Sequence, residues 1–313
     1  MNAARPLILV DMSLHPRAEA RLRGRAEVTT LPATGAPRVA ALARADGILA
    51  YGPPTPEELA AAGRLRAIAV HVAPPATRRA AAARGIAVLE SARLWRTVAE
   101  HTLALLLATL RRIPQADAAI RDGRWPREDL KVPFSGRDLA GSTVGVLGAG
   151  RIGAPLLRML AGLETVTLFA DSRALPELAH DTGAAQVDLD TLVAASDVLV
   201  VALPLDGATR GLVGADQIAR MRPGAVLINT ARGPVVDEAA MTAALRDGHL
   251  GAAGLDVHGD EPLPAAHPLL ALDNVVITPH LGGSTLECDL ELVDGLLDAL
   301  GAGPEPSAHP RTP

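Results

Sequence analysis

A glycine-rich turn between an apolar run and an amphipathic segment constrains the fold of this chain more than any other feature. The turn reads Gly148-x-Gly150-x-x-Gly153, with the apolar run 144–147 before it and the amphipathic segment 154–163 after it. Strand, tight turn and helix in this order present a helix N-terminus to a pyrophosphate. The first glycine permits the sharp turn, the second lets the phosphates approach the backbone, and the third lets helix and strand pack closely. The motif therefore predicts a dinucleotide site.

The residue after the next apolar run indicates which dinucleotide binds. Residues 165–170 form a predicted strand, and Asp171 follows it directly. A carboxylate at this position accepts a hydrogen bond from a ribose 2′-hydroxyl and repels a 2′-phosphate, which favours NAD. Arg173 lies two residues further on, and a cation there is able to accept a 2′-phosphate. NADP is therefore the less favoured alternative.

Short apolar runs alternate with amphipathic segments on both sides of this turn. The alternation predicts an α/β fold with two doubly wound parallel-sheet domains. We expect residues 1–93 plus 286–313 to form a smaller, flavodoxin-like substrate domain, and residues 94–285 to form a Rossmann dinucleotide-binding domain. A long helix is predicted over 97–113, where Pro114 interrupts or ends it, and the polar stretch 122–138 is predicted to be a loop. A helix over 78–84 is predicted in the first domain.

Composition and charge limit the classes of function. The chain has 313 residues and a net charge of −5, which is unlike the basic surface of a nucleic-acid-binding domain. Its single cysteine, Cys288, excludes an internal disulfide and a cysteine metal cluster, and fits a reducing compartment. No signal-peptide pattern or membrane-spanning run is present. We expect a cytoplasmic protein that binds no metal, nucleic acid or membrane.

Three residues with reactive side chains follow strands of the predicted Rossmann sheet. Arg232 comes after 226–229, Glu261 after 254–257, and His280 after 275–278. Ligands of open α/β sheets bind beyond the carboxyl ends of the strands. A guanidinium can hold a carboxylate in two hydrogen bonds, and a carboxylate beside an imidazole orients the ring and favours its protonated form. The imidazole can then give a proton to a carbonyl oxygen while nicotinamide gives a hydride to the carbon.

Each of these residues also has an ordinary structural explanation. Arg232 before a glycine can cap a turn, Glu261 can be a solvated loop acid, and His280 can be a hydrogen-bonded turn histidine. Only their combination in one dinucleotide domain indicates catalysis. The remaining histidines, among them His101 and His258, are interpreted as structural, and His258 alone of these lies near the predicted site.

The chain resembles the D-isomer-specific 2-hydroxyacid dehydrogenases, the family of formate, glycerate, phosphoglycerate and phosphite dehydrogenases. The matching stretches are 98–101, 148–153, 202–205, 209–211, 221–237, 254–257 with Glu261-Pro262, and 274–280. The resemblance is strong from about Gly85 to Thr285 and weak on either side. It implies an NAD-dependent oxidoreductase that transfers a hydride between nicotinamide and a small D-2-hydroxy acid or 2-oxo acid.

The resemblance also implies roles for single residues. Arg232 would bind the substrate carboxylate and carbonyl, His280 would be the acid–base residue with Glu261 as its partner, and Asp256 would bind the nicotinamide carboxamide. The other residues expected to line the cofactor are Thr97, Arg151, Ile152, Asp171, Pro204, Thr209 and Ala231. The long helix and the loop after it, residues 97–130, would form a two-fold homodimer interface.

The turn after the fourth predicted strand departs from the family pattern. The family has a glycine-rich turn whose backbone N–H groups hold the substrate carboxylate, and this chain has Ala-Val-His-Val-Ala-Pro-Pro-Ala-Thr over residues 69–77. Pro74 and Pro75 have no N–H group to offer. His71 and Val72 can still donate, and we expect them to contact the substrate.

This departure leaves three interpretations open. In the first, the loop is merely remodelled and the substrate is an ordinary 2-oxo acid. In the second, His71 with Arg93, Arg96 and the neighbouring Trp95 makes a cation-rich pocket for a phosphonate, a phosphite or another dianion. In the third, the chain is a non-catalytic NAD(H)-sensing corepressor, although a sensor has no need of a proton donor.

Overall fold

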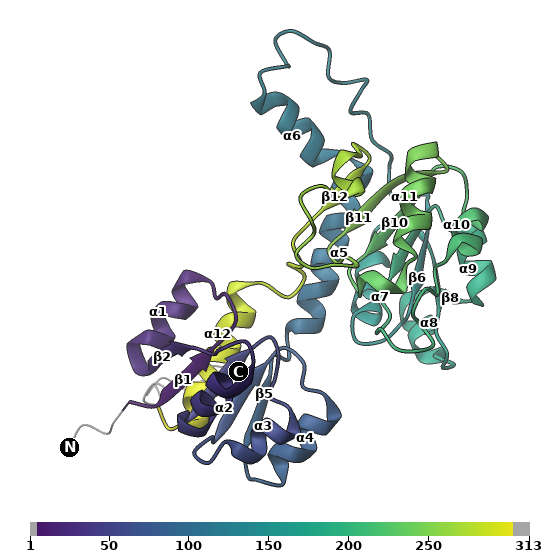
Figure 1. Ribbon diagram of the computed structural model, residues 1–313. Helices are drawn as coiled ribbons and strands as arrows, with labels where there is room; N and C mark the ends of the chain where they lie inside the picture. The colour runs from purple at the N-terminus through teal and green to yellow at the C-terminus, as the bar shows by residue number, and fades with distance from the viewer. Residues whose placement is uncertain (1–4, 303–313) are drawn as a thin grey trace, which may run out of the picture. The chain divides into compact units, whose positions relative to one another are not determined.

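The structure, a computed structural model, describes residues 5–302, and the chain divides into two compact units (Figure 1). One unit takes the residues up to Leu94 and those from Gly283 onward, and the other is Trp95–Gly282. Residues 303–313, which the sequence assigns to the first domain, lie outside the described residues.

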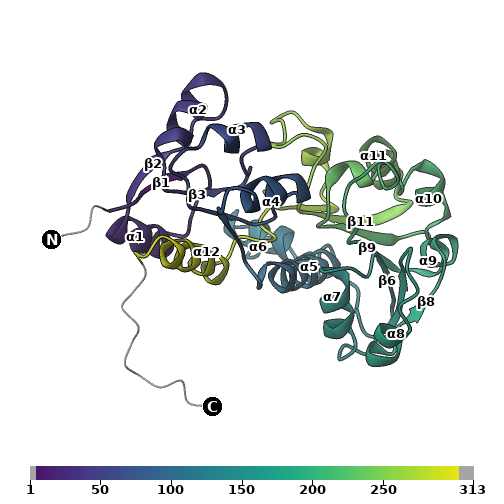
Figure 2. The ribbon, with the colours of Figure 1, turned by 90° about the horizontal axis from the view of Figure 1, so that it is seen from below.

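The first unit is built on a five-stranded parallel sheet with strands in the order β2-β1-β3-β4-β5. This is the flavodoxin-like order. Its strands are β1 (Leu7–Val10), β2 (Glu27–Thr30), β3 (Gly47–Ala50), β4 (Ala67–Val70) and β5 (Ala87–Glu90), and its helices are α1 (Pro16–Arg25), α2 (Gly35–Arg44), α3 (Pro56–Ala61), α4 (Pro75–Ala82) and α12 (Leu286–Ala299). Buried leucines of α1 and α12 pack on one face of the sheet, and those of α2 and α3 on the other (Figure 2).

The second unit has a seven-stranded parallel sheet in the order β12-β11-β10-β9-β6-β7-β8, the Rossmann order with one strand added at an edge. The strands are β6 (Thr143–Leu147), β7 (Val166–Ala170), β8 (Ala185–Gln186), β9 (Val198–Val201), β10 (Ala225–Asn229), β11 (Leu250–Leu255) and β12 (Val275–Ile277). The helices are α5 (Leu94–Leu110), α6 (Ile113–Arg121), α7 (Gly153–Leu160), α8 (Pro176–Thr182), α9 (Leu189–Ala195), α10 (Ala215–Arg220) and α11 (Glu238–Asp247), with 3-10 turns at η1 (Gly233–Val235) and η2 (Pro268–Ala271).

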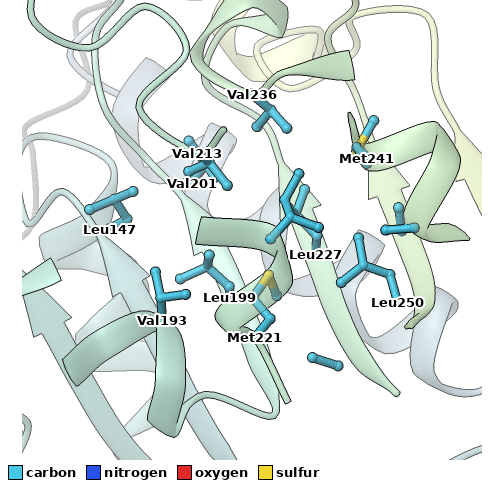
Figure 3. Close-up of a cluster of buried hydrophobic side chains, with 14 of the residues drawn as sticks. Leu147, Val193, Leu199, Val201, Val213, Met221, Leu227, Val236, Met241 and Leu250 are labelled. Carbon is cyan, nitrogen blue, oxygen red and sulfur yellow. The ribbon is translucent and has the colours of Figure 1, made fainter. Parts of the chain in front are cut away.

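Helices cover both faces of this second sheet, and each face has its own core. Leu199 and Leu227 from the central strands pack with Met221 on one face (Figure 3). Phe169 and Val146 pack on the other face. Strands buried on both faces appear in the sequence as nearly continuous apolar runs, which is why they were predictable. The predicted α/β class with two doubly wound sheets is confirmed.

The helix predicted over 97–113 differs from the one observed. Helix α5 ends at Leu110, because Arg112 adopts a left-handed conformation with φ 50°. Pro114 does not end a helix but lies in the first turn of α6. The N–H groups of a first turn have no partner within the helix, so the N–H group that proline lacks costs no helical hydrogen bond. The polar stretch 122–138 contains turns and neither helix nor strand, as predicted. Helix α8 and the two-residue β8 were not predicted.

Candidate active site

The glycine-rich turn after β6 gives each glycine a distinct physical role. Gly148 has φ +96°, and a Cβ there would lie 2.8 Å from the carbonyl oxygen of Ala202. A Cβ on Gly153 would lie 1.9 Å from the Gly148 oxygen, so helix α7 approaches the strand as closely as it does only because this residue lacks a side chain. A Cβ on Gly150 would meet no protein atom within 4 Å. The space beside Gly150 and the N-terminus of α7 therefore fit a pyrophosphate.

Asp171 follows β7 and lies beside the same turn. Its Oδ2 accepts a hydrogen bond from Ala149 N at 3.0 Å, and its Oδ1 accepts one from Arg173 Nε at 2.9 Å. The Arg173 side chain is the main reason why the pKa of Asp171 is lowered, ahead of the opposing effect of burial. The carboxylate thus stays charged next to the glycine turn.

The other residues expected to line the cofactor follow strands of the second sheet, except Thr97, which lies on a helix. Ile152 immediately precedes α7, and Arg151 stacks over the Trp95 ring, 5.0 Å from its centroid. Thr209 Oγ1 donates to the Pro204 carbonyl oxygen at 2.6 Å and closes the turn after β9. Ala231 is buried, and Thr97 lies on α5.

Arg232 comes after β10 with its side chain exposed. Its Nη1 donates to the carbonyl oxygen of Ala231 at 2.6 Å, and within residues 5–302 the guanidinium has no carboxylate partner. The following residue, Gly233, explains its position, because a Cβ there would lie 2.0 Å from the His258 carbonyl oxygen. The turn that bears Arg232 is thereby packed directly against the loop that bears Glu261.

Glu261 and His280 form a hydrogen-bonded pair. Glu261 Oε2 lies 2.7 Å from His280 Nδ1, and Glu261 Oε1 accepts from the backbone N–H of His258 at 3.0 Å. Burial raises the pKa of Glu261, but the bonds from His280 and His258 outweigh it, and the pKa is lowered overall. The bond at Nδ1 leaves Nε2 as the ring atom that can exchange a proton, and within the described chain Nε2 has no partner.

Asp256 organises the turn that carries His280. Its carboxylate is buried and accepts hydrogen bonds from Thr278 Oγ1 at 2.6 Å, from Leu281 N at 2.7 Å and from Gly282 N at 2.8 Å. His101 Nε2 lies 3.2 Å from the same carboxylate. Burial raises the pKa of Asp256, yet the bonds from His101, Thr278 and Leu281 lower it overall.

His101 and Thr278 are site residues that the sequence reasoning missed. From the sequence, His101 is interpreted as structural. A signal was present, since His101 is three residues after Val98 and four before Leu105, both buried. This spacing places its ring on the inner face of α5. Thr278 lies two residues before His280, and nothing in its sequence position indicated that its hydroxyl would bind Asp256.

In the first unit, His71 and Val72 directly follow β4. The His71 ring meets that of Tyr51 edge to face with centroids 5.5 Å apart, and Val72 is partly exposed. The two prolines that interrupt the family pattern begin a helix: Pro74 is the N-cap residue of α4 and Pro75 its first residue. The start predicted at residue 78 was therefore wrong, because proline suits the first turn of a helix.

Arg93 and Arg96 contribute less free charge than expected, and Arg96 lies on helix α5. Arg96 Nε lies 3.0 Å from Glu100 Oε1 one helical turn away, so its charge is paired. The Trp95 ring stacks with the guanidinium of Arg151. Arg93 is exposed; its backbone N–H donates to Glu291 Oε2 at 3.4 Å, and its guanidinium has no carboxylate partner within the described residues.

Within residues 5–302, no helix is long and apolar enough to cross a membrane. The same residues contain no group of three or more His, Cys, Asp or Glu side chains that could hold a metal ion.

Comparison with known proteins gives a consistent result. A family model described as "D-isomer specific 2-hydroxyacid dehydrogenase, NAD binding domain" matches residues 103–282. The chain is 38% identical over 294 residues to the D-3-phosphoglycerate dehydrogenase of Mycobacterium tuberculosis, a match that covers 90% of this chain and 54% of that protein. It is 41% identical over 223 residues to glyoxylate/hydroxypyruvate reductase B of Yersinia pestis, covering 69% of this chain and 68% of the relative.

A solved structure shares the fold. The NADPH-dependent glyoxylate/hydroxypyruvate reductase of Sinorhizobium meliloti, in complex with citrate, superposes with a TM-score of 0.76 at 32% identity, over 95% of this chain and 94% of that one. The chain spans between 36% and 54% of the length of the phosphoglycerate dehydrogenases it matches. Since the family model covers more than half of the sequence, the chain belongs to the D-isomer specific 2-hydroxyacid dehydrogenase family.

Proposed function

We propose that this protein is an NAD-dependent oxidoreductase that interconverts a small D-2-hydroxy acid and the corresponding 2-oxo acid. The observation that carries the proposal is the 2.7 Å contact between Glu261 and His280. It lies in the same unit as the glycine turn and as the guanidinium of Arg232, which has no carboxylate partner among residues 5–302. A bound nicotinamide cofactor supplies or accepts the hydride. The protein's own residues supply the anion site and the proton.

The proton is proposed to move at His280 Nε2. In the reducing direction the substrate carbon gains a hydride and its carbonyl oxygen gains the Nε2 proton, which yields the hydroxyl group. Glu261 stabilises the protonated ring through Nδ1, and Arg232 holds the substrate carboxylate and carbonyl through its guanidinium. In the oxidising direction the neutral ring takes the proton back.

NAD is proposed as the cofactor because the Asp171 carboxylate stands beside the glycine turn. Its geometry favours a 2′-hydroxyl over a 2′-phosphate. Arg173 is the feature that would admit NADP, and the Sinorhizobium meliloti relative is NADPH-dependent. In this chain Arg173 is bonded to Asp171, which favours NAD.

The substrate is proposed to be an ordinary 2-oxo acid, with His71 and Val72 as further contacts. The dianion alternative required a cluster of free cations, and the Arg96 charge is paired with Glu100. A corepressor that only senses NAD(H) is disfavoured by the Glu261–His280 pair, which supplies a proton that sensing does not use.

A homodimer is proposed through residues 97–130. Helix α6 and the chain after it project away from the sheet of the second unit (Figure 1). They carry large apolar side chains that are about half exposed or more: Ile113 at 55%, Ile120 at 48% and Trp125 at 63%. Apolar exposure on this scale marks an interaction surface. The single cysteine fits a cytoplasmic location.

The test is oxidation of NADH against a panel of glyoxylate, hydroxypyruvate, 3-phosphohydroxypyruvate and phosphonopyruvate. Sustained turnover with the first two is expected. Preference for the phosphorylated or phosphonate compounds would establish the dianion alternative, and NADH binding without turnover of any 2-oxo acid would establish the sensor.

A further inference from the structure

His258 lies in the second unit and has no role in the proposed chemistry. It is a buried histidine between the loop that carries Glu261 and the turn that carries His280. Its backbone N–H donates to Glu261 Oε1 at 3.0 Å, and its ring Nε2 lies 3.3 Å from the carbonyl oxygen of Thr278. One residue thus contacts both sides of the acid–base pair.

The Thr278 contact assigns the tautomer of the His258 ring. A carbonyl oxygen can only accept a hydrogen bond, so Nε2 must carry the hydrogen. The other ring nitrogen, Nδ1, is buried and has no partner among residues 5–302. A buried histidine with an unsatisfied nitrogen is costly, and an apolar side chain would fill the same space without that cost. The Thr278 contact is therefore the only polar bond of the ring within the described chain.

Thr278 and its neighbours explain why this bond matters. The Thr278 oxygen also accepts from His280 N at 3.0 Å, and His280 has φ 56°. A histidine in the left-handed region is strained and persists only where its surroundings hold it. Asp256 fixes the two residues after His280 through Leu281 N and Gly282 N. Among residues 5–302, the His258 ring is the one group from another loop that bonds the Thr278 carbonyl oxygen.

We propose that His258 is a positioning residue that holds the Glu261 loop and the His280 turn against each other, so that Nε2 of His280 points to the substrate. The inference rests on the proposed function, in which His280 moves the proton. Loss of the His258 ring would free the Thr278 carbonyl oxygen from the Glu261 loop and would let Glu261 and His280 separate, while Asp256 would still bind the turn through Thr278 Oγ1, Leu281 N and Gly282 N.

The matched variants separate positioning from simple packing. His258→Leu fills the space but removes the donor, and His258→Asn keeps polarity but is too short to reach Thr278. His258→Gln carries an amide N–H group that can replace Nε2. His249 is the control, because its Nε2 also lies against a carbonyl oxygen, that of Ile218 at 2.9 Å, just before β11 and so at the opposite end of the sheet.

We expect His258→Leu and His258→Asn to lower kcat by about tenfold to a hundredfold, the loss that follows a misplaced catalytic group, with KM for NADH within about twofold. His258→Gln should recover to within about threefold of wild type, and His249→Leu should leave kcat unchanged. In parallel, NMR titration of the Glu261 carboxyl should show its pKa rising toward the ordinary value in His258→Leu. The backbone N–H of residue 258 is kept in this variant, so the rise would report loosening of the His280 bond, which is the largest of the causes that lower this pKa.

Unchanged kcat and an unmoved Glu261 titration in both His258→Leu and His258→Asn would overturn the proposal. Equal losses in His258→Gln and His258→Leu would show that packing alone accounts for the residue, and would overturn it too. If wild-type protein turns over no 2-oxo acid, the proposed function fails, while the Glu261 titration still decides whether His258 holds the pair. If either His258→Leu or His258→Asn does not fold, the other still tests the proposal.

Discussion

His280 Nδ1 lies 2.7 Å from Glu261 Oε2, although the two residues are 19 positions apart and belong to loops after different strands. The bond fixes which ring nitrogen faces away from the protein. It also joins the ring to a carboxylate that itself accepts a hydrogen bond from the His258 backbone N–H. The pair is the part of the site on which the predictions about catalysis depend.

Replacing the ring tests its role as the proton donor. In His280→Ala we expect turnover to fall by about 10² to 10⁴-fold, since that is the usual contribution of a positioned acid–base group. NADH should still bind, because the glycine turn and Asp171 do not contact His280. Steady-state kinetics and fluorescence titration with NADH check both parts. Turnover as in wild type would exclude His280 as the acid–base residue.

Glu261→Gln tests the electrostatic coupling. The carboxylate favours the protonated ring, and the amide does not. We expect the pH limb for oxidation of the hydroxy acid, which requires a neutral ring, to move to lower pH. The Glu261 pKa is lowered in the fold, so its contribution to stability is present above the ordinary glutamate pKa and is lost as pH falls through the lowered value. An unmoved kinetic profile would contradict the coupling.

Asp171→Ala tests the choice of cofactor. Without the carboxylate, the repulsion of a 2′-phosphate is gone and Arg173 is released from its 2.9 Å bond. The ratio of kcat/KM for NADPH to that for NADH should rise by about tenfold or more, the scale of one charge-assisted interaction. Adding Arg173→Ala should remove most of the gain. A ratio that stays constant in Asp171→Ala would show that selectivity lies elsewhere.

The apolar surface of α6 gives a test of assembly. Ile113→Lys with Ile120→Lys places two charges on this half-exposed surface and should convert a dimer into a monomer in light scattering after size exclusion. Val166→Lys is the control, because Val166 is 56% exposed at the start of β7, outside residues 97–130. If the α6 double variant and the Val166→Lys control were both dimers, the dimer interface would lie on another surface.

The sequence predicted the strands and the residues after them because both follow simple physical rules. A strand covered on both faces is apolar throughout, and the ends of parallel strands gather at one edge, so Arg232, Glu261 and His280 could be proposed together. Contacts that depend on helix rotation were not accessible in this way. The spacing of His101 indicated the inner face of α5 but not Asp256 as the partner of its ring, and no spacing rule specified that the His258 ring reaches Thr278. Pro114 and Pro75 show a further limit, since proline both ends helices and begins them.

The glycine turn allows a sharp test, because two of its glycines are required for different reasons. Gly153→Ala would place a Cβ 1.9 Å from the Gly148 oxygen, and Gly150→Ala would place one in open space. We expect Gly153→Ala to destabilise the fold by about 1–3 kcal/mol, the usual range for overpacking, which lowers the melting temperature without cofactor. Gly150→Ala should melt as wild type does but bind NADH about tenfold more weakly, because its methyl group occupies the space proposed for the pyrophosphate. If Gly150→Ala bound NADH as tightly as wild type does, the pyrophosphate would not lie in the space beside Gly150.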